Sequence, residues 1–333
     1  MLSQGHIGCA RTSRATAWAG KVFAVLAYLA LPVLLQLGTT MPPAYTPDTS
    51  EQVQAILLEL DQIETDDLLE KLESLAQQGD DSAAELLGEI HSFGLFGITR
   101  NRALACDYFE RVSDRRPDGL HNRATCHFDG EGRQQDFEKA RTLYRLAAQG
   151  GWHQAWCAYG NMLIHGQGGP ADIPEGLRLC RMAAAAGDRD AQTDLGGYFL
   201  MGVGMERDPV AARFMLEQAA SQDQANAAFL LGQIHEKGDG TPVDNAAAGE
   251  WFAKAYEWGR ADAAFRAGSA LARRGFRMEG EEMFINEPLM REAIEWFALA
   301  ERFDPDADTR TKASEMIASG SRLIAAAGKA PPE

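Results

Sequence analysis

Residues 191–212 have the sequence Ala-Gln-Thr-Asp-Leu-Gly-Gly-Tyr-Phe-Leu-Met-Gly-Val-Gly-Met-Glu-Arg-Asp-Pro-Val-Ala-Ala, and versions of this pattern occur before and after it at one fixed interval. Steps of 36 residues from Gly196 always arrive at a small residue, namely Gly88, Ala124, Gly160, Gly232 and Gly268. A period of roughly 20–50 residues indicates a solenoid or another repeat array. The sequence therefore predicts one elongated domain that grows by stacking similar units.

Each unit carries the pattern of two short helices joined by a glycine-rich turn. Apolar residues recur at helical spacing before the repeated small residue, and two glycines follow it, as at Gly202 and Gly204. A glycine or alanine at the repeated position lets a neighbouring helix pack closely. Aspartates stand where the second helix should begin and can accept from its free amides. The sequence predicts an all-α fold, with structural positions at Gly88, Gly160, Gly196, Gly232, Gly268, Asp136, Asp172, Asp208 and Asp244.

The pattern divides the chain into five regions. We expect a signal peptide or signal anchor at residues 1–40, a linker rich in proline and threonine at 41–50, and a degenerate capping pair of helices at 51–80. Six repeats are predicted over residues 81–303, and a C-terminal capping helix with a short tail over 304–333.

The amino-terminal region resembles an export signal. A basic segment with Arg11, Arg14 and Lys21 precedes an apolar run at residues 22–37. The run is shorter than the about 20 residues of a comfortable membrane span, and no clear cleavage site follows, so a cleaved peptide and a retained anchor both stay open. We expect the basic flank to stay inside, which makes the protein periplasmic or anchored in the inner membrane, with its repeats outside the cytoplasm. A start at Met41 with a cytoplasmic product is the alternative.

The sixth unit contains nine additional residues around positions 277–286. Insertions in a repeat array map to a loop on one side of the solenoid. Met283 and Phe284 make this loop unusually apolar. It is interpreted either as a docking patch for a partner or as a loop that folds back over the last helices.

Several units together resemble the Sel1-like repeat family, a branch of the tetratricopeptide-like helical repeats. The family pattern is matched by Ala191, Leu195-Gly196, Tyr198, Gly202-Val-Gly204, Asp208, Ala211-Ala212 and Ala219-Ala220 in one unit, and by Asp136, Lys139-Ala140, Ala147-Ala148 and Gly150 in another. The first unit departs from it, with Arg100 where the aspartate belongs. The resemblance implies a right-handed α-α superhelix that serves as a binding scaffold and performs no chemistry, and it does not name the partner.

Charge and motifs exclude several classes of function. The formal net charge is −16, which argues against binding to nucleic acid or to anionic lipid. The glycine turns follow helices instead of strands, so they are turns and not phosphate-binding loops. No Ser-x-x-Lys, Gly-x-Ser-x-Gly or His-Glu-x-x-His motif is present. We therefore expect no catalytic residue, no metal and no cofactor, and interpret His91, His127 and His235, which share one repeat position, as packing residues.

Four cysteines follow the predicted signal region: Cys106, Cys126, Cys157 and Cys180. An even number outside the cytoplasm favours disulfides. The pairs Cys106–Cys126 and Cys157–Cys180 fall on consecutive predicted helices and are the easiest to form, while other pairings stay open. Buried free thiols that fill helix contacts are the alternative.

Polar residues directly after the small repeated residue form a further periodic set: Glu89, Thr125, Asn161 and Gln233. In related repeats the first helices line the concave wall, so this polar ladder is expected to face a groove that suits a peptide or a partner helix. An ordinary solvated face is the alternative. With Met283 and Phe284, these residues are the candidate partner contacts.

The leading functional hypothesis is a non-enzymatic scaffold at the cell envelope that holds a protein or peptide partner through its concave face. One alternative is an enzyme of the cell wall or a β-lactam-binding protein similar to cysteine-rich Sel1-like proteins, although the cysteine spacing here differs from theirs. The other alternative is a regulator tethered to the membrane through a single anchor at residues 22–37.

Overall fold

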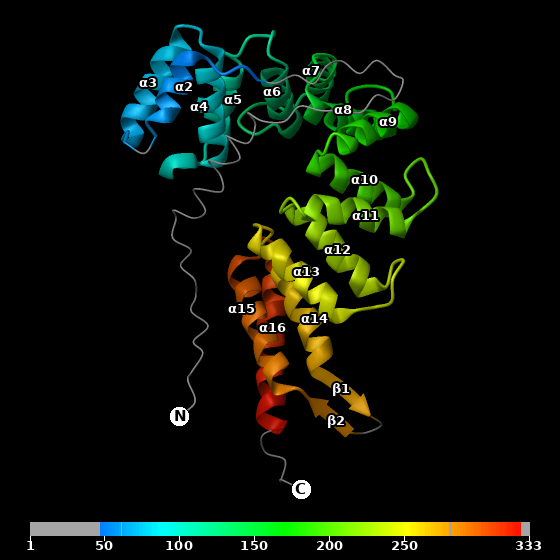
Figure 1. Ribbon diagram of the computed structural model, residues 1–333. Helices are drawn as coiled ribbons and strands as arrows, with labels where there is room; N and C mark the ends of the chain where they lie inside the picture. Colours follow the sequence, from blue (N-terminus) through cyan, green and yellow to red (C-terminus); the bar gives the residue numbers. More distant parts are fainter. Residues whose placement is uncertain (1–46, 61, 280–281, 328–333) are drawn as a thin grey trace.

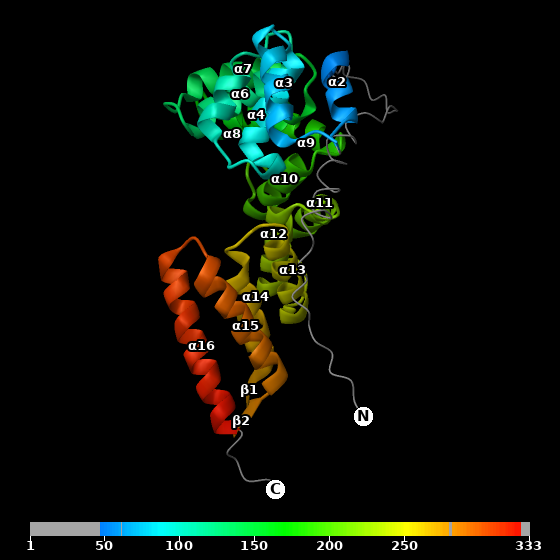
Figure 2. The same ribbon diagram turned by 90° about the vertical axis from the view of Figure 1, so that its left-hand side faces the viewer.

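The structure is a computed structural model in which residues 47–60, 62–279 and 282–327 are described. Their helices follow one another in a curved stack with two arms, one from α2 to α9 and the other from α10 to α16 (Figures 1 and 2). The predicted signal region and most of the predicted linker lie outside the described residues. The expected all-α solenoid is confirmed, with a small hairpin near its carboxyl-terminal end.

The helices alternate along the chain as first and second members of each repeat. Before the repeats come α2 (Glu51–Leu58) and α3 (Thr65–Gln77). The first helices are α4 (Asp81–Phe93), α6 (Pro117–Asp129), α8 (His153–His165), α10 (Arg189–Met201), α12 (Ala225–Lys237) and α14 (Ala263–Gly275). The second helices are α5 (Arg102–Phe109), α7 (Phe137–Gln149), α9 (Ile173–Ala185), α11 (Pro209–Ala220), α13 (Asn245–Glu257) and α15 (Glu287–Phe303). A short 3-10 helix (Leu95–Gly97), the strands β1 (Phe276–Glu279) and β2 (Glu282–Ile285), and α16 (Ala307–Ala327) complete the described elements.

The repeated glycine marks the place where the two helices of a unit touch. A Cβ atom on Gly232 would lie 2.6 Å from the ring of Phe252, and one on Gly160 would lie 2.6 Å from the carbonyl oxygen of Gly176. Real Cβ atoms do not approach neighbours this closely. The repeated position must therefore be small, because the second helix packs directly on the backbone of the first.

A single backbone hydrogen bond closes the turn within each repeat. The amide of Asp136 donates to the carbonyl of His127 at 2.8 Å, and the amide of Asp172 donates in the same way to Leu163 at 2.8 Å. The Asp136 and Asp172 side chains then accept from the first turn of α7 and α9, as predicted. In the first repeat this capping role falls to Asn101, one residue after Arg100.

The second glycine of each turn joins one repeat to the repeat before it. Gly168 has a φ of +67°, and a Cβ there would lie 2.1 Å from the carbonyl oxygen of Phe137 at the start of α7. Gly204 sits in the same way against Ile173 in α9. Both the left-handed backbone and the close approach require glycine.

The insertion in the sixth unit forms a hairpin and not a loop. β1 and β2 are antiparallel, and Phe276 pairs with Ile285. Met283 and Phe284 are 42% and 41% exposed, and β2 also contacts the last helix, α16. The docking patch and the segment that folds back over the last helices therefore both stay predictions. The hairpin fits between the helices because the Asn286 amide donates to the carbonyl of Gly275 at 2.8 Å and closes its base.

We predict opposite effects for alanine at two adjacent glycines in α10. A Cβ on Gly196 would lie 2.6 Å from Cγ of the buried Leu216, whereas one on Gly197 meets no atom within 4 Å. Gly196→Ala should lower the free energy of unfolding by about 1–3 kcal/mol through overpacking. Gly197→Ala should raise it by about 0.5–1 kcal/mol through helix propensity. Chemical denaturation of both variants measures the two effects, and equal signs would contradict the packing role of Gly196.

Candidate functional site

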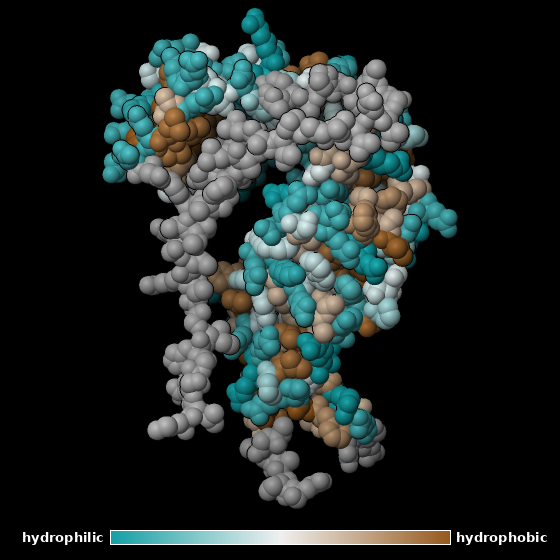
Figure 3. Space-filling model, viewed as in Figure 1, coloured by the Kyte–Doolittle hydropathy of each residue, from teal (hydrophilic) through white to brown (hydrophobic). Residues whose placement is uncertain are grey.

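The inner face of the solenoid is formed by the first helices of the repeats. In the middle of the molecule, α10 contacts both α8 and α12, while no comparable contact joins α9 to α11 or α11 to α13. The first helices therefore lie closer together, on the inside of the curve. Where the second arm borders the hollow of the molecule, Figure 3 shows mainly hydrophilic residues. This surface is the best candidate for a binding site.

The four residues of the polar ladder are all half-buried, one on each of α4, α6, α8 and α12. The structure does not bring them together, since they lie on different repeats. The Thr125 hydroxyl lies 2.8 Å from the hydroxyl of Tyr144, so it is engaged inside its own repeat. Gln233 makes no side-chain hydrogen bond to another described residue, and the fourth repeat has Gly197 at this position. The ladder is therefore a set of separate positions with different partners.

Asn161 lies at the centre of a cluster between the third and fourth repeats, which we call the central polar cluster (Asn161, His165, Asp194 and Tyr198). The Asn161 amide nitrogen donates to Asp194 Oδ2 at 2.6 Å, and the Tyr198 hydroxyl donates to Asn161 Oδ1 at 2.7 Å. Tyr198 also lies 3.3 Å from His165 Nε2. Burial, together with the charges of Asp190 and Asp188, raises the pKa of Asp194 to about 6. The cluster, which includes a carboxylate and an imidazole, links α8 of the third repeat to α10 of the fourth, two helices of the inner face.

Three members of this cluster were not among the residues expected from the ladder. The signal was present in the sequence, because the position two residues before the repeated small residue is polar in three units, as Asn122, Asp194 and Arg266. These residues bond to the preceding repeat: Asn122 to Glu85, Asp194 to Asn161 and Arg266 to Glu236. In these three units, a polar side chain three residues before the ladder position therefore contributes to the polar character of the inner face.

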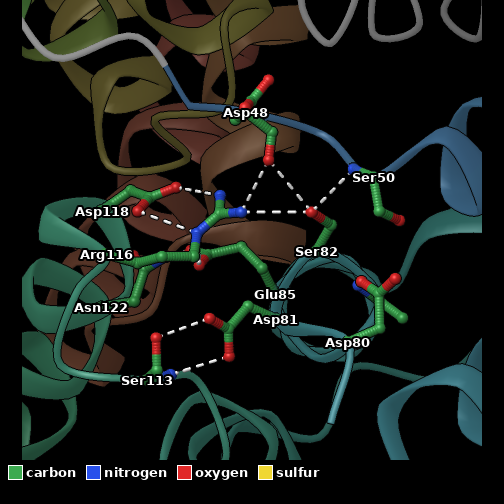
Figure 4. A network of polar contacts seen from close by, with 11 residues as sticks. Asp48, Ser50, Asp80, Asp81, Ser82, Glu85, Ser113, Arg116, Asp118 and Asn122 are labelled. Atoms are coloured by element: carbon green, nitrogen blue, oxygen red, sulfur yellow. Dashed lines mark hydrogen bonds and ion pairs between the residues drawn. The ribbon is translucent and has the colours of Figure 1, made fainter. Parts of the chain in front are cut away.

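A second polar network lies at the amino-terminal ends of α4 and α6 (Figure 4). Arg116 pairs with Asp118 and donates to the carbonyl of Asp48 at 2.9 Å. Ser82 donates to the same carbonyl at 3.1 Å and accepts from the amide of Ser50 at 3.1 Å. The last residues of the predicted linker are therefore docked on the first two repeats.

Next to this network, the carboxylates of Glu85, Glu89 and Asp118 share one nearby cation, Arg116. Glu85 is buried, accepts a hydrogen bond from Asn122, and has Arg116 Nε 3.9 Å from its second oxygen. Burial, reinforced by repulsion from Asp118, raises the pKa of Glu85 to about 8 and that of Glu89 to about 7. The ladder residue Glu89 is therefore part of an acidic cluster that holds protons near neutral pH.

Two histidines of the shared repeat position, His91 and His127, contact side chains in or directly after α5. His91 stacks on Tyr108, with ring centroids 5.5 Å apart, and His127 Nε2 lies 3.2 Å from Glu110 Oε1. Within the described residues, no group of three or more His, Cys, Asp or Glu side chains is placed to hold a metal ion.

The structure joins the four cysteines in two disulfides. Cys106 of α5 is bonded to Cys126 of α6, and Cys157 of α8 is bonded to Cys180 of α9. These are the two pairings that the sequence makes easiest. The first connects two successive repeats, and the second connects the two helices of the third repeat, behind the central polar cluster.

The decisive comparison is with protein families. The model of the Sel1 repeat matches five times, at residues 81–115, 117–152, 154–188, 189–224 and 225–257. The chain belongs to the Sel1 repeat family. The sixth predicted unit lies beyond these matches, yet α14 and α15 pack in the same way, with Gly268 against Phe297. This Sel1 repeat protein matches none of the curated proteins with which it was compared.

Solved structures of other Sel1 repeat proteins share the fold. A Sel1 repeat protein from Oxalobacter formigenes is 20% identical with a TM-score of 0.58, and the alignment covers 78% of this chain and all of that one. A protective antigen of uropathogenic Escherichia coli strains, which displays an SLR fold, is 22% identical with a TM-score of 0.52, and the alignment covers 84% of this chain and 61% of that one. At such identities, the likeness concerns the fold alone.

The predicted membrane anchor lies outside the described part of the chain. Among the residues that are described, no helix has the length and apolar character needed to cross a membrane.

We predict that stability falls with rising pH because of the acidic cluster. The pKa of Glu85 lies above its ordinary value of 4.5, so the folded state holds more protons than the unfolded state up to about pH 8. The free energy of unfolding should therefore fall as the pH rises through this window. Glu85→Gln should make this decrease smaller. The free energy of unfolding of the variant should exceed that of the wild type by about 1 kcal/mol or more at pH 8, and the two should differ little near pH 5.

Two features sharpen this measurement. Burial lowers the pKa of His121 to about 4, so its effect lies below pH 6.5 and does not overlap the range from neutral to alkaline pH. Glu175→Gln is the matched control. The Glu175 side chain is exposed and forms an ion pair with Arg178, which lowers the pKa of Glu175. Denaturation curves from pH 5 to 9 should show the gain only for Glu85→Gln. A loss of stability in that variant at pH 8 would mean that Glu85 is ionised and stabilises the fold.

Proposed function

We propose that this Sel1 repeat protein is an exported, non-enzymatic scaffold whose inner face holds a protein or peptide partner. Sel1 repeats suggest a protein-interaction scaffold in general. We propose in addition that the partner contacts the inner surface around the third to fifth repeats. The compartment would be outside the cytoplasm.

The central polar cluster carries the proposal. It places the carboxylate of Asp194 and the imidazole of His165 on the inner side of the curve, held by Asn161 and Tyr198. Fixed hydrogen-bonding groups on rigid helices need little ordering when a partner binds, so more of the interaction energy appears as affinity. Asp194 offers a carboxylate to a backbone amide or a cationic side chain.

Gly197 leaves room beside the cluster. It follows the repeated glycine of α10, at the same position as Asn161 in α8, and a Cβ there would meet no atom within 4 Å. A peptide chain can approach the helix backbone closely at this point. The net charge of −16 favours a partner segment that carries basic residues.

The inner-face contact is tested by filling this space. Gly197→Arg should fold, because a Cβ at this position would meet no atom within 4 Å. It should reduce capture of the partner at least tenfold by occupying the surface. Gln218→Arg is the matched control, since it adds the same charge to an exposed position of the outer helix α11. The measurement is in-cell crosslinking of the tagged full-length protein, followed by quantitative mass spectrometry. Equal capture by all three proteins would refute the inner-face contact.

The disulfides support an oxidising compartment. The structure contains two disulfides. Disulfides form and persist outside the cytoplasm and are rare inside it. Together with the basic and apolar amino-terminal region, they favour export.

We predict that these four cysteines are already paired in disulfides when the protein is recovered from cells. When intact cells are quenched with acid and the protein is denatured without reductant, Cys106, Cys126, Cys157 and Cys180 should not react with a thiol reagent. Cys106→Ser should expose one reactive thiol, that of Cys126, and is the positive control. Labelling of all four in the wild type would show reduced thiols and argue against export. Reduction of each bridge should also cost about 3 kcal/mol of stability.

A further inference from the structure

The hairpin of the sixth repeat has one fully apolar face. The strands pair Phe276 with Ile285 and Met278 with Met283, so these four side chains project to the same side. Arg277, Glu279 and Phe284 occupy the other side. The insertion thus builds a small two-sided sheet, which none of the five matched repeats contains.

This apolar hairpin face (Phe276, Met278, Met283 and Ile285) is open to solvent. Phe276 is 39% exposed, Met278 is 51% exposed and Met283 is 42% exposed. The hairpin projects from the carboxyl-terminal end of the stack, where β1 contacts α14 and β2 contacts α16 (Figure 1). A two-stranded hairpin is marginally stable by itself, and unpaired strand edges attract further strands.

The outer edge of β1 offers the backbone groups of Phe276 and Met278. The Asn286 amide donates to the Gly275 carbonyl at 2.8 Å, so Gly275 and Asn286 form a hydrogen-bonded pair at the base of the hairpin. Hydrogen-bonded and non-bonded pairs alternate in an antiparallel ladder. The backbone N–H and C=O groups of Phe276 and Met278 therefore point away from β2, while those of Arg277 point toward β2.

We propose that β1 pairs with β1 of a second copy of this chain, antiparallel and about a two-fold axis at Met278. In this register, the outward backbone groups of the two Met278 residues bond to each other. Arg277 lies opposite Glu279 of the second copy, and Glu279 lies opposite Arg277 of the second copy. The dimer contains a four-stranded sheet whose apolar face combines both hairpins.

Charge complementarity selects this occupant and this register. Arg277 and Glu279 lie on either side of Met278 and already form an ion pair of 2.8 Å within one hairpin. A two-fold axis at Met278 makes every charged pair opposite in sign, whereas an axis at Arg277 would place the two arginines against each other. A lipid surface is disfavoured, because β1 ends at the acidic Glu279 and the chain has a net charge of −16.

The dimer should be weak and dependent on concentration. Few residues pair, so the buried area falls at the low end of specific interfaces. Each copy also carries a net charge of −16, which opposes association. The inner face takes no part in the contact, so this inference does not depend on the proposed partner site.

The test uses charge reversal and sedimentation of the full-length protein. The wild type should form a dimer as its concentration rises. Arg277→Glu or Glu279→Arg should weaken the dimer about tenfold, because each puts like charges opposite each other at two places. The double variant Arg277→Glu/Glu279→Arg should recover the dimer. Arg178→Glu, which breaks an exposed ion pair on α9, is the matched control and should dimerise like the wild type.

A mixture of the two single variants gives the sharpest result. Each alone should dimerise about tenfold more weakly than the wild type. Mixed together they should form a heterodimer as readily as the wild type dimerises, because every pair across the axis then joins opposite charges. Circular dichroism confirms that each variant is folded. A wild type that stays monomeric, or that instead sediments with anionic vesicles, would overturn the proposal. So would single variants that dimerise normally, or a mixture that remains monomeric.

Discussion

The contact between the two helices of each repeat is the constraint on which the rest of the structure depends. Where Gly196 meets Leu216 and Gly232 meets Phe252, a large side chain of the second helix fills the space that a Cβ of the first would need. This close approach fixes the angle and distance within a repeat. The turn glycines then fix each repeat against the one before it, as Gly168 does on α7. The curvature of the inner face follows from these local contacts, summed along the stack.

The fold could be predicted from the sequence because its determinants are local and repeat. A 36-residue period in small residues, turn glycines and capping aspartates defines a helix pair without knowledge of distant contacts. The hairpin shows the limit of this reasoning. Its alternating residues, Phe276-Arg-Met-Glu279, are a strand signal, but they stand in one short insertion without a second copy to define the pattern.

The candidate site was harder to predict because it depends on contacts between repeats. The ladder position identified Asn161 but not Asp194 or Tyr198, which reach it from the next repeat, 33 and 37 residues further along the chain. Glu89 is a candidate partner contact, and the structure adds that it belongs to an acidic cluster in which burial raises its pKa. Side-chain partners across a repeat joint depend on the twist between units, which the period alone does not specify. Specificity therefore resides where the copies differ and where neighbouring copies meet.

The bridge between Cys106 and Cys126 has a mechanical consequence. It crosses the joint between α5 and α6, where the helices touch more sparsely than at the other joints between repeats. The chain that enters from the amino-terminal side is fastened at Asp48 to Ser82 of the first repeat and Arg116 of the second. A force applied to the amino-terminal end is thus distributed over two repeats that a disulfide holds together. The array is protected against peeling from its first repeat, and tension passes into the stack as a whole.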